Sequence, residues 1–350
     1  MWTKCPAQPR MVARIPEQEP SEPAMEGTCA AWVAEMVLTG QRGACADMIG
    51  ERHENGWVVE PEMARHIQRY VDMVVARGGA ISTERKVRLN SMIAGTPDAY
   101  AVVTDSGHLY VDDLKYGYDI VEPETPQIAI YAGAILRQVI AKGVTIRHVT
   151  LGIYQPRAYH PSGHYRTLTT YPEELMSRVH EIERAGEKCQ DVNALAAPGD
   201  HCRRCRANAQ CAASAHLMYD RFYRMHHAQA REMTAEELAN ELSFLEECEA
   251  LLKGRTDAIK ADAEARIKTG RSVPGYRLEH GTGNRRWVVD ADTVRVMTGI
   301  DPTSGKMITP AEMERNNVPA ELIEHLTEKP RTKARLIKMP TDYIRGKFNG

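Results

Sequence analysis

The sequence lacks any apolar stretch of about 20 residues, the length that a helix needs to cross a bilayer. Its first residues also lack the apolar core of a secretory signal, so we expect a cytoplasmic protein. Lysine and arginine number 45 against 47 acidic residues, and this near balance excludes a strongly basic coat for nonspecific nucleic-acid binding. No internal repeat or low-complexity tract is present, which excludes a repeat architecture.

What is present is typical of a globular protein with one large domain or two modest ones, since 43% of the 350 residues are hydrophobic and 26% are charged. Residues 1–24 are proline-rich and are expected to be irregular. Hydrophobic periodicity predicts helices at 26–38, 61–77, 126–142 and 172–188, and strands at 81–89, 99–104, 108–114, 144–154 and 165–170. The first three strands are expected to form an antiparallel meander.

The C-terminal part of the sequence has a different pattern. Residues 189–212 are irregular, and helix is expected from about residue 215 onward. The segment Thr234-Ala-Glu-Glu237 is a capping box that predicts the start of a long helix reaching about Lys268. Strands are expected near 276–280 and 287–290. We therefore divide the chain into a first domain at 1–215, a helical segment at 216–270 and a mixed α/β tail at 271–350.

Two carboxylates and a lysine stand out in the predicted meander. Asp98 precedes one strand, while Asp113 and Lys115 come at the end of the next. Residues two apart in a strand point to the same face, so Asp113 and Lys115 are expected to project together, while Leu114 points into the core and offers its carbonyl oxygen. A meander can bring Asp98 beside them.

This grouping suits phosphodiester hydrolysis. Carboxylates hold Mg²⁺ or Mn²⁺, hard cations that prefer oxygen ligands, and the ion polarises phosphate and acidifies a bound water. Lys115 can orient or deprotonate that water and offset negative charge on the phosphate, but a base role requires a lowered pKa. The alternative is a strand-end aspartate with a solvated lysine, because an isolated D-x-K triplet is common by chance.

Eight cysteines are present, and three of them form the spacing C-x2-C-x5-C at Cys202, Cys205 and Cys211. Such spacing lets a loop place three thiolates around one metal centre, and Cys5 is the best candidate for the fourth ligand. Zinc also takes four thiolates and remains the main alternative to an iron–sulfur cluster. The remaining four cysteines, Cys29, Cys45, Cys189 and Cys248, are expected to be small apolar residues. Of these, Cys29 and Cys189 are reserve ligands in case Cys5 does not bind the metal.

Together these motifs resemble the RecB-family nuclease signature, G-x-x-D, then D-x-K, then Q-x-x-x-Y, here Gly95–Asp98, Asp113–Lys115 and Gln127–Tyr131. The order of motifs over residues 2–211 resembles phage-encoded RecB-like exonucleases of the PD-(D/E)xK type. The resemblance implies a restriction-endonuclease-like fold of the α/β (α+β) class, with a central mixed sheet flanked by helices. It also implies that 1–215 is a nuclease domain.

The resemblance further implies roles for individual residues. Asp98, Asp113 and the Leu114 carbonyl would bind the divalent ion, with Lys115 beside them. Gln127 and Tyr131, four apart on one helix face, would line the site. For these two the alternative is an amphipathic helix with a solvated edge. Glu84 is a further candidate catalytic residue, with a solvated strand charge as its alternative.

For the cysteines, the layout resembles the AddB-type nucleases and the iron–sulfur nucleases of CRISPR adaptation, with one cysteine before the nuclease core and three after it. This implies a [4Fe–4S] cluster on Cys5, Cys202, Cys205 and Cys211. We interpret such a cluster as a structural staple that closes a very long loop.

One position departs from the family pattern. The helix that includes Ala31 resembles a family helix that usually supplies a histidine near the metal, and we expect that histidine where Ala31 stands. The chain either lacks this ligand naturally or carries a replacement that inactivates it. The main functional expectation is therefore an exonuclease, and the alternative is a catalytically impaired protein that binds DNA ends.

Basic clusters provide candidate contacts to nucleic acid. Arg203, Arg204, Arg285 and Arg286 are expected to bind phosphate, and Trp287 to stack on a base. The alternative to DNA binding is that Trp287 is a core residue of the tail and that the arginines form a solvated rim. The expected substrate is linear DNA, double- or single-stranded. A phage single-strand-annealing recombinase is an expected partner, because the resemblance places such enzymes in phage recombination or repair.

Overall fold

The computed structural model describes residues 1–17, 19–226, 233–282, 285–302, 308–315 and 318–338. The chain forms two compact units. The N-terminal unit comprises Met1–Ala207 and Cys211–Asp220, and the C-terminal unit comprises Asn208–Gln210 and Arg221–Gly350. Each is described by itself.

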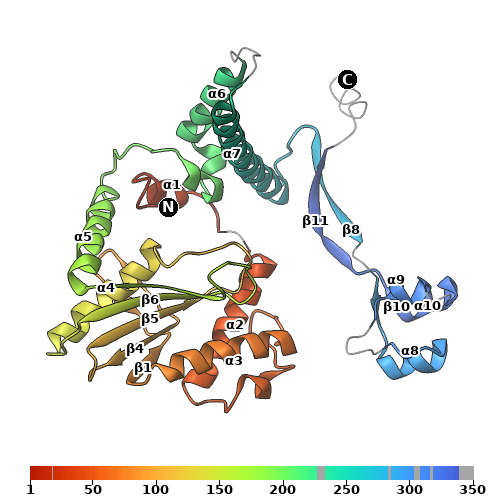
Figure 1. Ribbon diagram of the computed structural model, residues 1–350. Coiled ribbons are helices and arrows are strands. Elements are labelled where there is room, and N and C mark those ends of the chain that lie inside the picture. Colours follow the sequence, from red (N-terminus) through yellow and green to blue (C-terminus); the bar gives the residue numbers. More distant parts are fainter. Residues whose placement is uncertain (18, 227–232, 283–284, 303–307, 316–317, 339–350) are drawn as a thin grey trace. The chain divides into compact units, whose positions relative to one another are not determined.

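A five-stranded mixed sheet forms the centre of the N-terminal unit (Figure 1). Its strand order is β1-β4-β5-β6-β7, in which β5 and β6 are parallel and all other neighbours are antiparallel. The strands are β1 (Ala80–Thr83), β4 (Ala99–Val103), β5 (His108–Leu114), β6 (His148–Tyr154) and β7 (Tyr165–Thr170). The expected central mixed sheet is therefore confirmed.

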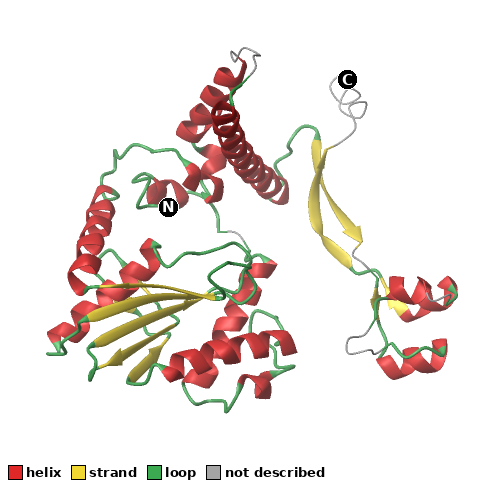
Figure 2. Cartoon of the chain, in the orientation of Figure 1, coloured by secondary structure: helices red, strands yellow, loops and turns green. Residues whose placement is uncertain are grey.

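Helices cover both faces of this sheet, as Figure 2 shows. On one face, α4 (Pro126–Ala141) and α5 (Pro172–Lys188) pack with Leu109 and Val111 of β5 into a hydrophobic core. On the other face, α2 (Glu22–Leu38) and α3 (Pro61–Ala76) pack into a second core that includes Leu114. The alternation of β5 side chains between the two cores sends Asp113 to the face of Val111. The helices thus flank the sheet as expected.

The parallel pair places the end of β5 beside the end of β6. Parallel neighbours need a crossover connection, and α4 supplies it between β5 and β6. Pro126 at the start of α4 suits the first helical turn, where a backbone N–H would have no partner within the helix. Gln127 and Tyr131 therefore lie in the first turns of the helix that follows the D-x-K strand.

Three local predictions were wrong. The single strand expected at 81–89 is two strands, β1 and β2 (Val87–Arg88), and Glu84 between them has a φ of 45°, which breaks an extended conformation. The expected irregular start contains α1 (Gln8–Val12), and α2 begins at Glu22. The strand expected from residue 144 begins at His148.

The remaining elements up to residue 226 are η1 (Cys45–Met48), β3 (Ala94–Gly95), η2 (Asp200–Arg204), η3 (Asn208–Gln210) and α6 (Ala212–His226). Of these, η3 belongs to the C-terminal unit, and α6 is divided between the two units after Asp220. The predicted irregular segment 189–212 thus holds only two short 3-10 turns, at η2 and η3, within the described residues.

The C-terminal unit contains the long helix α7 (Ala235–Lys268), whose N-terminus has the predicted capping box, since Glu237 N–H donates to Thr234 Oγ1 at 3.2 Å. Two antiparallel pairs follow. The other elements are β8 (Tyr276–Thr282), β9 (Arg286–Trp287), α8 (Ala291–Thr298), α9 (Pro310–Arg315), α10 (Ala320–Leu326), β10 (Thr327–Glu328) and β11 (Arg331–Lys338). Residues 339–350 of the predicted tail lie outside the described residues.

Candidate active site

Asp113 and Lys115 meet at the end of β5. Asp113 is only 3% exposed, and Lys115 Nζ lies 2.6 Å from Asp113 Oδ2. Burial lowers the pKa of Lys115, but the charge of Asp113 and the hydrogen bond to it outweigh burial, so the net shift of the Lys115 pKa is upward. Lys115 is therefore an ammonium group in this state, which suits charge stabilisation better than a base role.

Asp98 joins this pair across the β4–β5 ladder. Its Oδ2 accepts a hydrogen bond from the Leu114 N–H at 2.5 Å, so the carboxylate is fixed at the strand end. Burial raises the pKa of Asp98 to about 7, and the charge of Asp113 adds to this shift. Burial also raises the pKa of Asp113, although Lys115 opposes the change.

These carboxylates have the donor chemistry that a hard divalent cation needs. Asp98 and Asp113 are buried oxygen donors whose charges repel each other, and a cation would offset that repulsion. The residues therefore fit Mg²⁺ or Mn²⁺ in donor type. Within the ranges that the structure describes, no three His, Cys, Asp or Glu side chains are close enough together to form a metal site.

Gln127 and Tyr131 of α4 face the same carboxylates. Gln127 Nε2 donates to the Tyr131 hydroxyl at 2.8 Å. Burial raises the pKa of Tyr131, and the charge of Asp113 contributes. Gly95 of the G-x-x-D motif lies under the Tyr131 ring, since a Cβ at Gly95 would be 2.3 Å from Tyr131 Cε1. The glycine of the motif is thus explained by close packing against the tyrosine of another motif.

Glu84 also turns toward this site. Its backbone N–H donates to the Asp98 carbonyl oxygen at 3.3 Å, which holds the residue in its unusual positive-φ conformation. Burial raises the pKa of Glu84, and the charges of Glu35 and Asp113 add to the shift. Glu84, Asp98, Asp113, Lys115 and Tyr131 are thus close enough for their charges to act on one another, and Gln127 joins them through its hydrogen bond to Tyr131.

A cavity of about 530 Å³ opens beside Glu84. Ala31 lines it together with Glu35, which comes one helical turn later in α2, and with His53, whose ring lies 5.3 Å from that of Trp32. The full lining is Thr28, Ala31, Trp32, Glu35, Arg52, His53, Glu54 and Glu84. The lining includes Glu84 but not Asp98, Asp113 or Lys115, so Glu84 is the residue that the cavity shares with the carboxylate group. Sequence reasoning named Ala31 but neither Glu35 nor His53, although Glu35 lies four residues after Ala31 on the same helix face.

Asp112 adopts the opposite orientation to Asp113 and serves the fold. It is fully buried on the α3 face, where Tyr165 Oη donates to its Oδ1 at 2.6 Å and Arg77 Nε lies 3.8 Å from its Oδ2. Gly152 makes room for this contact, because a Cβ there would lie 2.3 Å from Asp112 Oδ1. Of two consecutive aspartates, strand alternation therefore leaves only Asp113 for the site.

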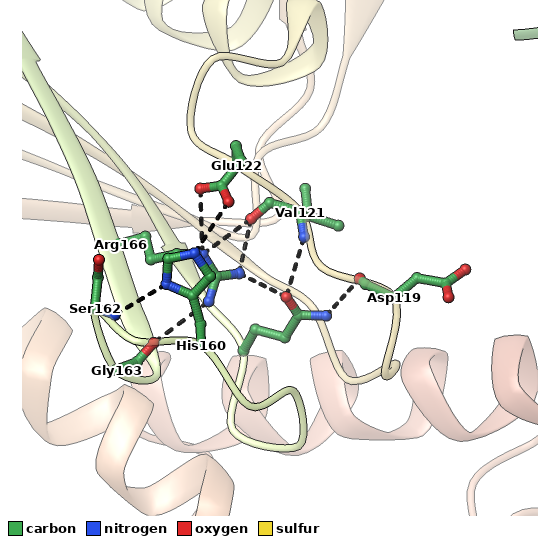
Figure 3. Close-up of polar contacts among 8 residues, drawn as sticks. Asp119, Val121, Glu122, His160, Ser162, Gly163 and Arg166 are labelled. Carbon is green, nitrogen blue, oxygen red and sulfur yellow. Dashed lines mark hydrogen bonds and ion pairs between the residues drawn. The ribbon is translucent and has the colours of Figure 1, made fainter. Parts of the chain in front are cut away.

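The loop after Lys115 is held in place by Gln155, which follows β6. Gln155 is fully buried, and its Nε2 donates to the Gly117 and Asp119 carbonyl oxygens at 2.9 and 2.8 Å. Its Oε1 accepts from the Val121 N–H and from Arg166 Nη2 at 3.2 and 2.6 Å. Figure 3 shows the contacts with Asp119, Val121 and Arg166. We call residues 117–122 the clamped loop.

A second layer of charge supports the clamped loop. Glu122 lies 3.6 Å from Arg166 Nε and 3.3 Å from His160 Nε2 (Figure 3). Arg166 is 4% exposed, and its guanidinium also donates to the Val121 carbonyl oxygen. The backbone that continues from Lys115 is thus fixed by buried, hydrogen-bonded groups.

A protein-family comparison identifies the relatives of the chain. The model of the family described as "Protein of unknown function (DUF2800)" matches residues 1–342. The chain belongs to the DUF2800 family. No curated protein matches this DUF2800 sequence. One crystal structure, from Eubacterium rectale and described as a "putative exonuclease", is 10% identical and covers 66% of this chain and 84% of its own, with a TM-score of 0.32. A likeness this distant does not support a shared activity.

Four cysteines of this DUF2800 protein lie close to one another. Cys5, Cys202 and Cys211 are buried and Cys205 is half-buried. Burial raises the pKa of the Cys202 and Cys205 thiols, and the charges of Cys5 and Cys211 add to both shifts. The predicted ligands thus lie within range of one another's charge, although among the described residues they do not form a group that could hold a metal ion. The cluster itself stays a prediction.

The other cysteines have apolar or local surroundings. Burial raises the pKa of Cys29 to about 11 and that of Cys45 to about 12, so both thiols are unreactive at neutral pH. Cys248 is buried in α7. Cys189 Sγ donates to the Ala185 carbonyl oxygen at 3.2 Å, and burial, followed by the charge of Cys5, raises its pKa.

The predicted DNA contacts belong to different units. Arg203 and Arg204 are exposed on the N-terminal unit, where Arg204 pairs with Asp119 at 2.8 Å. In the C-terminal unit, Arg285 pairs with Glu314, and Trp287 Nε1 donates to the Ile308 carbonyl oxygen at 2.8 Å.

Trp287 also packs against the small core of the C-terminal unit, so it has the packing role left open from sequence. The Arg286 side chain lies outside the described residues. Contacts of these residues with DNA stay predictions. Among the described helices, none is long and apolar enough to cross a membrane.

Proposed function

We propose that this protein is a metal-dependent DNA nuclease of the PD-(D/E)xK type that acts on DNA ends. The observation that carries the proposal is the meeting of Asp98, Asp113 and Lys115 at the end of β5, with Lys115 Nζ 2.6 Å from Asp113. Phosphodiester hydrolysis needs oxygen ligands for a divalent ion and a nearby cation. The chain offers both within one hydrogen-bonded group.

In this proposal Asp98, Asp113 and the Leu114 carbonyl hold Mg²⁺ or Mn²⁺, which supplies Lewis acidity to the phosphate and to a water. Lys115 remains an ammonium group and stabilises negative charge on the phosphate. Gln127 orients the Tyr131 hydroxyl toward the same space. Glu84 adds a third carboxylate, which also lines the cavity.

The direct test measures degradation of end-labelled linear DNA with Mn²⁺, with Mg²⁺ and with EDTA. We expect degradation with either ion and none with EDTA. A covalently closed circle should resist, because the proposed enzyme acts on ends. Lys115→Met should reduce the rate, whereas Lys142→Met, which removes an exposed lysine at the end of α4, should not. Equal rates for the two variants would contradict the proposed role of Lys115.

Ala31 supports a second candidate, a nuclease-fold protein that binds DNA ends without cutting them. Ala31 lines the cavity at the position where the family pattern has a histidine, so an imidazole there would join Glu84 and Glu35. If this candidate is correct, the wild type retards linear DNA in a gel without degrading it, and Ala31→His gains activity. A wild type that degrades DNA in Mn²⁺ rejects it.

For the cysteines we propose a [4Fe–4S] cluster on Cys5, Cys202, Cys205 and Cys211. The effect of these thiols on one another's pKa supports this ligand set. Anaerobically purified protein should be brown, with absorbance at about 400 nm from the cluster. A zinc site would give no such absorbance, because zinc is d¹⁰ and colourless. If the purified protein is colourless and contains one equivalent of zinc, these residues bind zinc and not an iron–sulfur cluster.

A further inference from the structure

The long helix α7 carries apolar residues on two different faces. One face is turned inward within the C-terminal unit. It includes the buried Cys248 and Leu251, and also Arg255, which donates to the Asn208 carbonyl oxygen at 2.8 Å. These positions follow the spacing of three and four residues that keeps side chains on one side of a helix. Packing inside the unit thus accounts for this first face.

The second face lies about a quarter turn away and is exposed. Its members share a spacing of seven residues, nearly two helical turns, with one further leucine between the first two. They are Leu238, Leu242, Leu245, Leu252 and Ile259, with exposed fractions of 53, 54, 42, 43 and 47%. We call these five residues the α7 stripe. A heptad repeat of this kind is typical of helices that pair with another helix.

The charges of α7 are divided between its two halves. Residues 235–251 contain six acidic residues and no basic ones, whereas residues 252–268 contain five basic and three acidic residues. A parallel partner of the same sequence would place the acidic halves together. An antiparallel partner places each acidic half against a basic half and also opposes the two helix dipoles.

We propose that the α7 stripe is a self-association surface at which two copies of this chain pack their α7 helices antiparallel. A two-fold interface uses the same patch on both copies, so the patch must be complementary to itself, and the charge division of α7 meets this condition. With Leu242 of one copy opposite Ile259 of the other, Glu246 of each copy lies near Lys253 of the other. Thus both apolar contact and charge favour one arrangement.

Glu249 falls within the stripe near its middle and is exposed. In the antiparallel arrangement it lies close to Leu252 of the other copy, where a carboxylate weakens an apolar contact. The dimer is therefore expected to be concentration-dependent, and this position offers a variant that strengthens association. Glu249→Leu should lower the dissociation constant about 10-fold or more, in line with the burial of one leucine side chain.

Sedimentation equilibrium on the full chain tests the surface. The apparent mass of the wild type should rise with concentration from 39.2 kDa, the mass of one chain, toward twice that value. The Leu245→Lys/Leu252→Lys variant should stay monomeric at every concentration. Val296→Lys on α8 is the matched control, because Val296 is 81% exposed and outside the stripe, and it should associate like the wild type. Circular dichroism checks that each variant keeps its helix content.

Three results would overturn the proposal. A wild type that stays monomeric at the highest concentration, together with a monomeric Glu249→Leu variant, would show that the stripe does not join two copies. A double-lysine variant that still dimerises would place the interface elsewhere. The orientation is tested by charge reversal: Lys253→Glu should weaken the dimer, and the double variant Glu246→Lys/Lys253→Glu should restore it. A double variant that still associates weakly would reject the antiparallel arrangement. None of these results depends on nuclease activity.

Discussion

Asp98 is the residue whose environment makes the clearest prediction about pH. Its pKa is raised to about 7 in the folded protein, from an ordinary value of 3.8, chiefly by burial. A raised carboxyl pKa means that the folded state retains a proton that the unfolded state has lost. The metal-free protein should therefore lose stability as pH rises from about 4 to about 7, by at most roughly 1.4 kcal/mol per pH unit.

Asp98→Asn removes this titration while keeping an oxygen that can accept from the Leu114 N–H. In EDTA, the variant should have a higher urea midpoint than the wild type at pH 8, and the difference should disappear near pH 4. Asp105→Asn, in the exposed turn of the same hairpin, should show no such pH-dependent gain. An Asp98→Asn variant that is less stable than the wild type at pH 8 would show that Asp98 carries no unfavourable charge.

Gly95 makes a second prediction, which concerns packing. A Cβ at Gly95 would lie 2.3 Å from the Tyr131 ring, so Gly95→Ala must displace Tyr131 and should cost roughly 1–3 kcal/mol of stability. Gly27→Ala in α2 is the matched control, because a Cβ there meets nothing within 4 Å. That change should stabilise the protein by roughly 0.5–1 kcal/mol. Thermal unfolding of both variants measures the contrast, and equal destabilisation would contradict the packing account.

Some residue-level features could be predicted from the sequence and others could not. The D-x-K spacing placed Asp113 and Lys115 on one face because strand alternation depends only on sequence separation. The positive φ of Glu84 could not be foreseen, since glutamate rarely adopts it and the conformation depends on the contact with Asp98. Glu35 and His53 join the cavity through tertiary packing.

At the scale of elements, the clamped loop makes a prediction that separates its role from general stability. Gln155→Leu keeps the volume but leaves the Gly117 and Asp119 carbonyl oxygens without their donor, which should cost roughly 3 kcal/mol. Amide hydrogen exchange should increase in 117–122. Ser162→Ala is the nearby control, because the hydrogen bond from Ser162 to His160 Nδ1 is donated by the backbone N–H, which the substitution keeps.

If Gln155→Leu left exchange in 117–122 unchanged, the clamped loop would be held by other contacts, and Gln155 would have only a packing role. If exchange rises in this segment but not in α5, the effect is local. This outcome would show that Gln155 fixes the backbone that follows Lys115.

Element boundaries could be predicted best where local signals agree. The bounds of β5 and β7 match those expected, because a turn with a positive-φ glycine, Gly107 or Gly163, comes just before each strand. The capping box set the start of α7 correctly because its hydrogen bonds are local. The single strand expected at 81–89 was wrong, since β-branched composition does not show where a chain bends.

At the scale of the molecule, the central mixed sheet and the helices that flank it followed from the family resemblance and not from periodicity alone. Periodicity cannot tell that β5 and β6 are parallel, because pairing depends on the crossover through α4. The division of the chain into two compact units is also a tertiary property. The nuclease proposal therefore depends on geometry in the N-terminal unit alone.

The most direct test of this account neutralises Asp113. Degradation of end-labelled linear DNA in Mn²⁺ should fall at least about 100-fold in Asp113→Asn, because the divalent ion loses a central ligand and Lys115 loses its partner. Asp105→Asn, in the exposed turn before β5, should degrade DNA like the wild type. If Asp113→Asn and the wild type degrade DNA at the same rate, the site at the end of β5 is not the catalytic site.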